Sequence, residues 1–346
     1  MTDRENGRCA AAACYFHMCA RRRRLQRKGI KMSWKHRREE ACKDKACEDK
    51  AYKDKALRYA DRQGRVTEVS TGQDKLLRGL YGSKTGRLLL KLLVSPAVTK
   101  IGGVLLNTRL SALFIGPFVR KNGIDLDQYG GQPYHSYNDF FTRPIKPECR
   151  PMNEEEEILI SPCDGKLSVY PIGQDSTFSI KNTQYTLTSL LRSQKLAKRY
   201  EGGYACVFRL TVDDYHRYCY MADGEKSDNR RIPGIFHTVN PAANDVYPIY
   251  KENTREYCLL KTKLFGILLV MEVGALMVGK ICNYHGAGHV LRGQEKGHFA
   301  FGGSTVVVLA PKGKVVLDEV LLSNTEKGCE TIVKMGERIG TAAVNR

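Results

Sequence analysis

The residues Gly302, Gly303, Ser304 and Thr305, followed directly by three valines and a leucine at 306–309, constrain the fold more than any other stretch of this chain. Glycines permit backbone conformations that other residues avoid, and a short aliphatic run is typical of a buried strand. The sequence therefore predicts a tight turn that leads into a core strand. Two glycines also leave the Gly303 carbonyl open to attack by the next hydroxyl, so this peptide bond is a candidate reaction site. The alternative is an ordinary turn before a strand.

Several other short runs of aliphatic and β-branched residues are separated by Gly, Pro, Asp or Asn, a spacing that predicts a β-rich core. The longest apolar stretch, residues 264–281, is interrupted by Glu272, Gly274 and Gly279, which favours two buried strands over a membrane helix. The strands that we expect are 158–160, 167–170, 205–210, 264–273, 276–281, 305–309 and 314–317.

Leucine-rich segments broken by Gly and Pro and flanked by basic residues occupy residues 75–121. This pattern predicts short amphipathic helices, which either cover the core or lie on an anionic membrane. No stretch of about 20 uncharged apolar residues occurs, so no membrane span is expected. We expect an α+β fold in which N-terminal amphipathic helices accompany the β-rich core.

Positive charge is concentrated at the N-terminus, since residues 1–65 carry +11 of the formal net charge of +19. Such a tail suits nucleic acid, an anionic membrane or a solvated arm. No aromatic-basic recognition motif supports nucleic acid, so none is expected as a partner. We predict three regions: a basic, low-complexity extension at 1–65, disordered or helical, membrane-contact helices at 66–130 and a β-rich catalytic core at 131–346.

The 12 cysteines lack paired spacing and are expected to be reduced thiols. No Cys-x-x-Cys pair accompanies them, so no metal site is predicted. The apolar stretch near the N-terminus precedes its arginines at 21–24, which argues against a secretory signal and favours a cytoplasmic location.

Three residues could together form an activated hydroxyl: Asp164, His216 and Ser304. An Asp, a His and a Ser supply the orienting group, the base and the nucleophile of such a site. Taken singly, each is typical of a turn or of a structural histidine, and sequence separation says nothing of distance. Ordinary serine hydrolysis fits less well, because no Gly-x-Ser-x-Gly elbow surrounds Ser304.

Over about residues 66–340 the chain resembles the phosphatidylserine decarboxylases, in particular the bacterial members with a Gly-Gly-Ser-Thr processing site. Five ordered motifs are far more specific than any one of them. The motifs are Tyr137-Asn138-Asp139-Phe140-Phe141-Thr142-Arg143, Ser161-Pro162-Cys163-Asp164-Gly165, Asp214-Tyr215-His216-Arg217, Val239-Asn240-Pro241 and Gly302-Gly303-Ser304-Thr305.

The resemblance implies a self-cleaving proenzyme. Ser304 would attack the Gly303 carbonyl and leave a β chain that ends at Gly303 and an α chain, residues 304–346, headed by a pyruvoyl group made from Ser304. His216 would take the Ser304 proton while Asp164 orients the imidazole. The pyruvoyl cofactor would form a Schiff base with the serine amine and serve as an electron sink, so that CO2 leaves and phosphatidylethanolamine is released.

The resemblance also implies the partners and the location. The substrate would be phosphatidylserine in an anionic membrane surface, contacted by residues 88–119, and the processed α and β chains would form a heterodimer, with a higher oligomer left open. The enzyme would attach peripherally to the cytoplasmic face of the cell membrane. Two alternatives remain: a pyruvoyl decarboxylase of a soluble amino acid, and a non-enzymatic basic lipid-binding module.

This sequence departs from the family at Cys219, where many members carry a second histidine three residues after the first. The task of that histidine is therefore unassigned. Either His216 serves both cleavage and later proton transfer, or His237 reaches the same site as an auxiliary group. The alternative for His237 is a core histidine in a turn.

Overall fold

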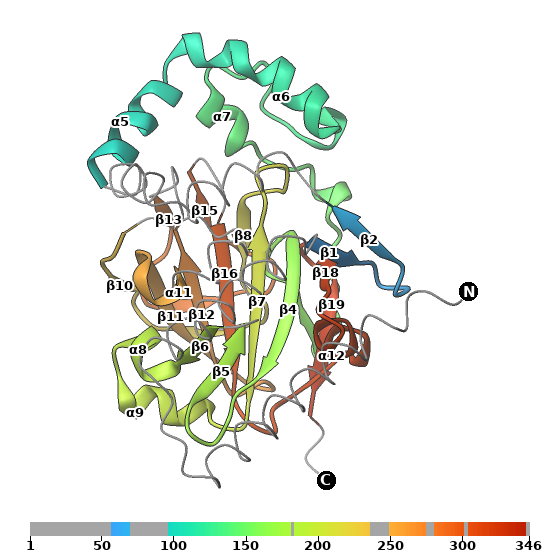
Figure 1. Cartoon of the computed structure of the whole chain (residues 1–346), viewed down its shortest axis with the longest axis vertical. Helices are drawn as coiled ribbons and strands as arrows, with labels where there is room; N and C mark the ends of the chain where they lie inside the picture. Colours follow the sequence, from blue (N-terminus) through green and yellow to red (C-terminus); the bar gives the residue numbers. More distant parts are fainter. Residues whose placement is uncertain are drawn as a thin grey trace, which may run out of the picture. The chain divides into compact units, whose positions relative to one another are not determined.

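The computed structural model describes residues 57–69, 96–180, 183–235, 249–274, 280–300 and 304–343. Helices and strands both occur throughout these ranges, and the α+β prediction is confirmed (Figure 1). The described cysteines are all free thiols.

The largest element is a sheet of eleven strands, counted over the described ranges, in the order β14-β9-β11-β12-β16-β7-β4-β18-β1-β2, with β10 paired to β11. Its central strand β16 is antiparallel to both of its neighbours, β12 and β7. The strands are β1 (Leu57–Ala60), β2 (Val66–Val69), β4 (Gly165–Pro171), β7 (Tyr204–Leu210), β9 (Gly224–Lys226), β10 (Arg230–Ile232), β11 (Arg255–Thr262), β12 (Ile267–Val273), β14 (Gly288–Val290), β16 (Ser304–Ala310) and β18 (Glu330–Val333).

Smaller sheets accompany the large one. Their orders are β13-β15-β8, β17-β19-β3 and β5-β6. The strands are β3 (Ile158–Ile160), β5 (Thr177–Ile180), β6 (Thr183–Thr186), β8 (Arg217–Cys219), β13 (Ile281–Asn283), β15 (Glu295–Phe299), β17 (Val315–Leu317) and β19 (Arg338–Ala342).

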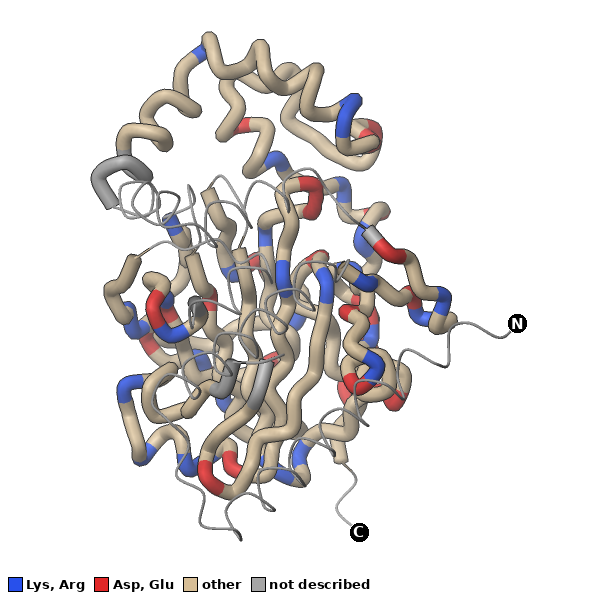
Figure 2. Tube along the Cα trace, viewed as in Figure 1, with Lys and Arg blue, Asp and Glu red and all other residues tan. Residues whose placement is uncertain are grey.

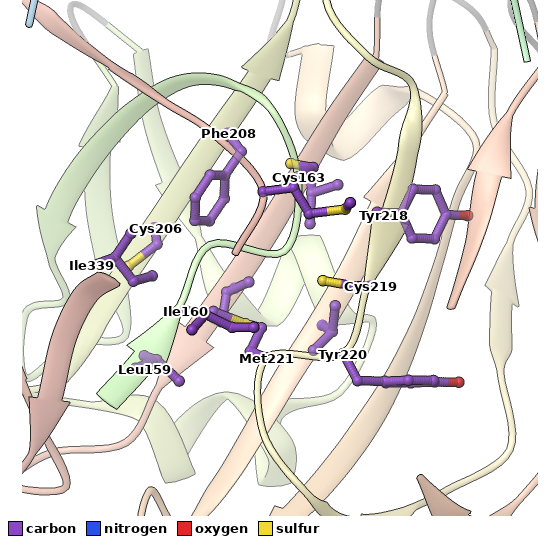
Figure 3. Close-up of a cluster of buried hydrophobic side chains, with 14 of the residues drawn as sticks. Leu159, Ile160, Cys163, Cys206, Phe208, Tyr218, Cys219, Tyr220, Met221 and Ile339 are labelled. Carbon is purple, nitrogen blue, oxygen red and sulfur yellow. The ribbon is translucent and has the colours of Figure 1, made fainter. Parts of the chain in front are cut away.

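The two faces of β16 pack into two different cores, because side chains alternate along a strand. Val306 and Val308 belong to a cluster that includes Phe208 of β7 and Phe299 of β15, part of which is drawn in Figure 3. Val307 and its neighbours on the other face pack into a second cluster. In the described ranges after residue 180, the helices are α8 (Leu187–Leu191), α9 (Gln194–Ala197), η4 (Lys198–Tyr200), α11 (Ile249–Glu252) and α12 (Glu319–Glu326).

A helical segment precedes the core strands, and Figure 1 draws α5, α6 and α7 together beyond the ends of β8 and β15. The short helix α7 begins at Ser136, whose hydroxyl caps the Asp139 amide at 3.1 Å. The Tyr137 amide donates to Ser111 at 2.9 Å, and the Phe118 ring lies edge-on against Phe140. These contacts hold α7 to the rest of the segment. Its elements are α5 (Pro96–Leu106), η1 (Arg109–Phe114), α6 (Ile115–Asn122), η2 (Leu126–Gln128), α7 (Tyr137–Phe141) and η3 (Pro147–Cys149).

No helix in the described ranges combines the length and the apolar character that a membrane crossing requires.

Most predicted strands coincide with observed ones. β3 has the predicted bounds, and the predicted runs at 167–170, 205–210, 305–309 and 314–317 fall on β4, β7, β16 and β17. The run at 264–273 falls on β12, whereas that at 276–281 meets β13 only at Ile281 and otherwise lies largely outside the described residues.

The N-terminal boundary differs from the prediction. The extension was expected to reach residue 65 and to be followed by helices, yet β1 and β2 already form a hairpin in the large sheet, where β1 pairs in parallel with β18. This pairing joins residues far apart in sequence, so no local pattern indicates it. Residues 1–56 and 70–95 lie outside the described part of the chain.

Candidate active site

Ser304 is the first residue of the central strand β16 and is fully buried. It pairs with Leu210 of β7, so its side chain lies on the face that carries Leu210, Val306 and the cluster around Phe208. Its Oγ makes no hydrogen bond with any described residue. A buried hydroxyl without a partner is rare, because the loss of hydration is not compensated. This cost is expected where the oxygen has a chemical task.

His216 lies in the connection between β7 and β8, and its ring is buried against Phe141 with 4.1 Å between ring centroids. Its Nδ1 lies 2.9 Å from the carbonyl oxygen of Asp214, which can only accept a hydrogen bond. The proton of the neutral ring is therefore on Nδ1, and Nε2 presents a lone pair. Nε2 has no partner among the described residues.

The protonation state of His216 is fixed by burial. Desolvation lowers its pKa to about 4, although the nearby Asp214 acts in the opposite direction. The ring is therefore neutral at pH 7. A buried neutral imidazole with a free Nε2 has the form that a general base requires.

The strand pairing brings Ser304 and His216 to the same edge of the two sheets. Ser304 pairs with Leu210, and residues 211–215 lead from there to His216. The Phe299 amide at the end of β15 donates to the His216 carbonyl at 3.0 Å, and four residues lead from Phe299 to Ser304. Such a connection spans at most about 18 Å. Two buried, unpartnered atoms, Ser304 Oγ and His216 Nε2, thus occur at one edge, without a hydrogen bond between them in this structure.

Asp164 lies just before β4 and contacts other groups than the His216 ring. Arg150 donates from Nε to Oδ1 at 2.9 Å and from Nη2 to Oδ2 at 2.5 Å, and the Met335 amide donates at 2.9 Å. Lys334 lies 3.4 Å away. The relay contact predicted between Asp164 and His216 is not formed here, because His216 Nδ1 faces the Asp214 carbonyl and Nε2 has no partner among the described residues, while Arg150 holds the Asp164 carboxylate.

The residue that orients the ring is instead Asp214, for which the sequence pattern alone indicates no role. Its carboxylate accepts from Lys166 Nζ at 2.6 Å and from the amide and hydroxyl of Thr211 at 2.7 and 2.8 Å. Burial would raise its pKa, but Lys166 and Thr211 outweigh burial and lower it. The charged side chain fixes the turn and directs the Asp214 carbonyl at His216. A Thr followed three residues later by an Asp is a turn signal that could have pointed to it.

Known proteins resemble this chain over most of its length. The family model described as phosphatidylserine decarboxylase matches residues 137–341, which is more than half of the chain. The chain belongs to the phosphatidylserine decarboxylase family. The matched span contains Asp164, His216 and Ser304, so all three candidate residues lie in the part that the family shares.

Curated relatives cover most of this decarboxylase. The phosphatidylserine decarboxylase proenzyme 2 of Clostridium acetobutylicum is 45% identical over 265 residues, which are 76% of this chain and 91% of that protein. The phosphatidylserine decarboxylase proenzyme of Ruminiclostridium cellulolyticum is 36% identical over 291 residues, 82% of this chain and 96% of the relative. One from Clostridium botulinum is 35% identical over 292 residues, 82% and 99% respectively.

Cys219, at the position where a second histidine was expected, is buried in β8. Its sulfur lies 4.0 Å from the Ser161 carbonyl, and Figure 3 shows it among Cys163, Tyr218 and Tyr220. Burial raises the pKa of its thiol to about 12, so the thiol stays protonated at neutral pH and cannot act as a base. His237, the auxiliary histidine proposed from the sequence, lies outside the described residues.

Proposed function

We propose that this phosphatidylserine decarboxylase cleaves itself between Gly303 and Ser304, carries a pyruvoyl cofactor made from Ser304, and converts phosphatidylserine to phosphatidylethanolamine and CO2. One observation carries the proposal: a buried, unpartnered Ser304 Oγ at the head of a central strand, at the same edge as a neutral histidine with a free Nε2.

In the cleavage, each of these residues has a defined task. Ser304 Oγ attacks the Gly303 carbonyl, and His216 Nε2 accepts the hydroxyl proton. The Asp214 carbonyl holds the Nδ1 proton and stabilises the positive ring that forms, much as a carboxylate does in other triads. The ester that replaces the peptide bond then breaks by elimination, and hydrolysis of the new N-terminus at position 304 releases ammonia.

The surroundings of Ser304 fit the group that would be made from it. When present, a pyruvoyl group supplies a carbonyl that binds the substrate amine and accepts the electrons of the breaking bond to the carboxylate. The chain contributes apolar walls, which include Leu210, Phe208 and Val306. An apolar site excludes water and disfavours the carboxylate charge relative to neutral CO2. Ser304 fixes the group at the end of a rigid strand.

Both processed chains would remain together as a heterodimer. After cleavage β16 belongs to the shorter chain, yet it pairs on one side with β12 and on the other with β7 of the longer chain. β18 likewise pairs with β4, and β19 with β3. These ladders connect the two chains without any covalent bond.

The helical segment supports peripheral attachment to a membrane, which we place at the cytoplasmic face of the cell membrane. The acyl chains of the substrate stay in the bilayer, so the enzyme must approach it. Most of this segment is uncharged in Figure 2, with basic residues such as Arg109, Arg120 and Lys121 at intervals. Apolar burial and attraction to anionic lipid add together in such a segment. The exposed apolar side chains are Ile101, Val104, Leu105, Leu110, Leu113 and Phe114.

Intact mass measurement of the purified wild-type chain beside Ser304→Ala tests the proposal. Wild type should yield a fragment of residues 304–346 with a blocked N-terminus, and Ser304→Ala should stay whole. The cleaved protein should then release CO2 from phosphatidylserine vesicles. An uncut wild-type chain, or a cut chain that releases no CO2, would contradict the proposal.

A further inference from the structure

Arg143, which follows α7, is a buried arginine with an unusual environment. Its side chain is 1% exposed, and its guanidinium carbon lies 4.0 Å from the ring centroid of Tyr129 and 4.4 Å from that of Phe140. Nη1 donates to the Phe140 carbonyl at 3.1 Å. Nε and Nη2 have no hydrogen-bond partner among the described residues.

The other buried arginines show how this fold normally compensates such a charge. Arg150 pairs with Asp164, and Arg209 pairs with Glu330. Arg255 has no carboxylate partner but donates from all three of its nitrogens to backbone carbonyls. Among the buried arginines of the described ranges, Arg143 therefore stands apart, with a cation that lies against two aromatic rings and has two nitrogens without a hydrogen-bond partner. A buried charge without such partners is costly, and a site that tolerates this cost is expected to use it.

The two unused nitrogens define the shape of the missing partner. Nε and Nη2 lie on one edge of the planar guanidinium, and their N–H groups point in parallel directions. Such an edge matches two oxygens of one anion, as in phosphate or carboxylate recognition. This pair of N–H groups, the guanidinium fork, is also shielded from water, so an anion that reached it would be bound strongly.

Arg143 also lies between the helical segment and the catalytic residues. On one side, Phe140 of α7 packs against Phe118 of α6, and η1 accepts the Tyr137 amide through Ser111. On the other side, the Phe141 ring lies against His216 at an angle of 40°. The order from the exposed apolar helices inward is thus α7 with Arg143, then His216. In phosphatidylserine the order from the acyl chains inward is glycerol, phosphodiester, then serine.

We propose that Arg143 binds the phosphodiester of the lipid headgroup through Nε and Nη2. This inference rests on the proposed function, since it takes phosphatidylserine as the substrate. The carboxylate is the less suitable ligand, because its charge disappears as CO2 leaves, and an arginine paired with it would stabilise the ground state more than the transition state. The phosphodiester keeps its charge throughout the reaction. Binding it holds the headgroup without opposing the chemistry.

Binding to the full-length Ser304→Ala chain tests the site without any catalysis. The probes are glycerophosphoserine, glycerophosphoethanolamine, free serine and inorganic phosphate, each titrated calorimetrically. Arg143→Gln should weaken binding of both phosphodiesters about 10- to 100-fold and leave serine binding unchanged, because it removes a charge-assisted pair. Arg143→Lys keeps the charge but loses the two parallel N–H groups, so its affinity for the phosphodiesters should lie between that of the parent chain and that of Arg143→Gln. Arg230→Gln, which removes an exposed arginine, is the matched control and should bind like the parent.

Several outcomes would overturn the assignment. Equal weakening of serine binding would make the carboxylate the ligand, and inorganic phosphate bound as tightly as glycerophosphoserine would indicate a free-phosphate site. Unchanged phosphodiester binding in a folded Arg143→Gln or Arg143→Lys chain would leave Arg143 a structural role only. If Arg143→Gln fails to fold, as judged by its urea unfolding curve, Arg143→Lys carries the test.

Steady-state kinetics with the self-cleaved proteins separate this inference from the proposed function. Arg143→Gln should raise KM for phosphatidylserine about 10-fold or more while cleavage at Gly303 proceeds. A wild-type chain that binds glycerophosphoserine through Arg143 but neither cuts itself nor releases CO2 would refute the proposed function and leave the site. Decarboxylation by Arg143→Gln at an unchanged KM would refute the site and leave the function.

Discussion

Replacement of His216 by glutamine should remove an acid sensitivity that the buried ring imposes on the fold. The pKa of His216 is about 4 in the folded chain, against an ordinary value of 6.5. Between these values the unfolded chain binds a proton at this residue that the folded chain does not bind. Stability from this group is therefore lost as the pH falls from 6.5 toward 4. Burial is complete, so solvent screening does not reduce the effect.

The size of the effect follows from the two pKa values. Linkage gives a loss of about 2 kcal/mol between pH 7 and pH 5 for the protein that carries His216. The glutamine variant lacks the titration and should show none of this loss. His298, whose pKa burial also lowers to about 4, is present in both proteins and cancels in the comparison.

Urea unfolding at pH 7 and pH 5 measures this difference. Both proteins should carry Ser304→Ala, so that neither is cut and each unfolds as one chain. The change in unfolding free energy between the two pH values should be about 2 kcal/mol larger for the protein with His216. Equal changes, or a larger change in the glutamine variant, would show that the ring is not buried in its neutral form. With Ser304 intact, His216→Gln should also slow self-cleavage by about 10²- to 10⁴-fold, the usual contribution of a general base.

Three further substitutions examine other parts of the structure. Lys296 and Glu272 form a fully buried ion pair with an Nζ–Oε1 distance of 2.8 Å, so Lys296→Met should lower stability by about 3–5 kcal/mol in urea unfolding. Adding Glu272→Leu should restore most of this stability, and no recovery would contradict the pairing argument. Asp164→Asn should lower stability by about 3 kcal/mol in urea unfolding, because it leaves Arg150 buried without a counter-charge. A folded, equally stable variant that no longer cleaves itself would instead support the relay role predicted from the sequence. Leu113 is 75% exposed, so Leu113→Glu should change the unfolding free energy by no more than about 0.5 kcal/mol relative to wild type. It should reduce sedimentation with anionic vesicles about 10-fold. Unchanged sedimentation would place the membrane contact elsewhere.

The strands that were predicted well are those whose signal is local. β16 and β3 are short aliphatic runs bounded by turn residues, and their bounds depend on little else. The order of strands is not local. Nothing in residues 304–310 indicates that this strand lies between β7 and β12, or that β1 pairs with β18. These pairings are decided by which buried faces fit together, and they join residues that range from about 30 positions apart, for β12 and β16, to more than 250, for β1 and β18.

The candidate site was predicted in its residue types but not in its contacts. The sequence points to Ser304 and His216, and the structure places both at one edge, each buried and each with one unpartnered atom, Ser304 Oγ and His216 Nε2. Asp164 was expected to orient His216 because an Asp, a His and a Ser together suggest a triad, yet Arg150 binds that carboxylate. Sequence cannot show which partner a charged group chooses. For Arg143 the sequence indicates no task, because neither its burial nor its unpartnered nitrogens can be inferred from composition or spacing.

The position of β16 determines when the enzyme can become active and whether its activity can be renewed. The nucleophile is in place only when this strand is inserted between two others, so the chain must fold before it can react. In the proposed mechanism a misfolded copy cannot make its own cofactor, so only correctly folded chains become active. In the proposed mechanism the event is irreversible, because the peptide bond is broken and ammonia is lost. The new chain end is then held in β16 between β12 and β7, so a damaged terminus is not exchanged. Each molecule is therefore activated once, and lost activity can be replaced only by synthesis of a new chain.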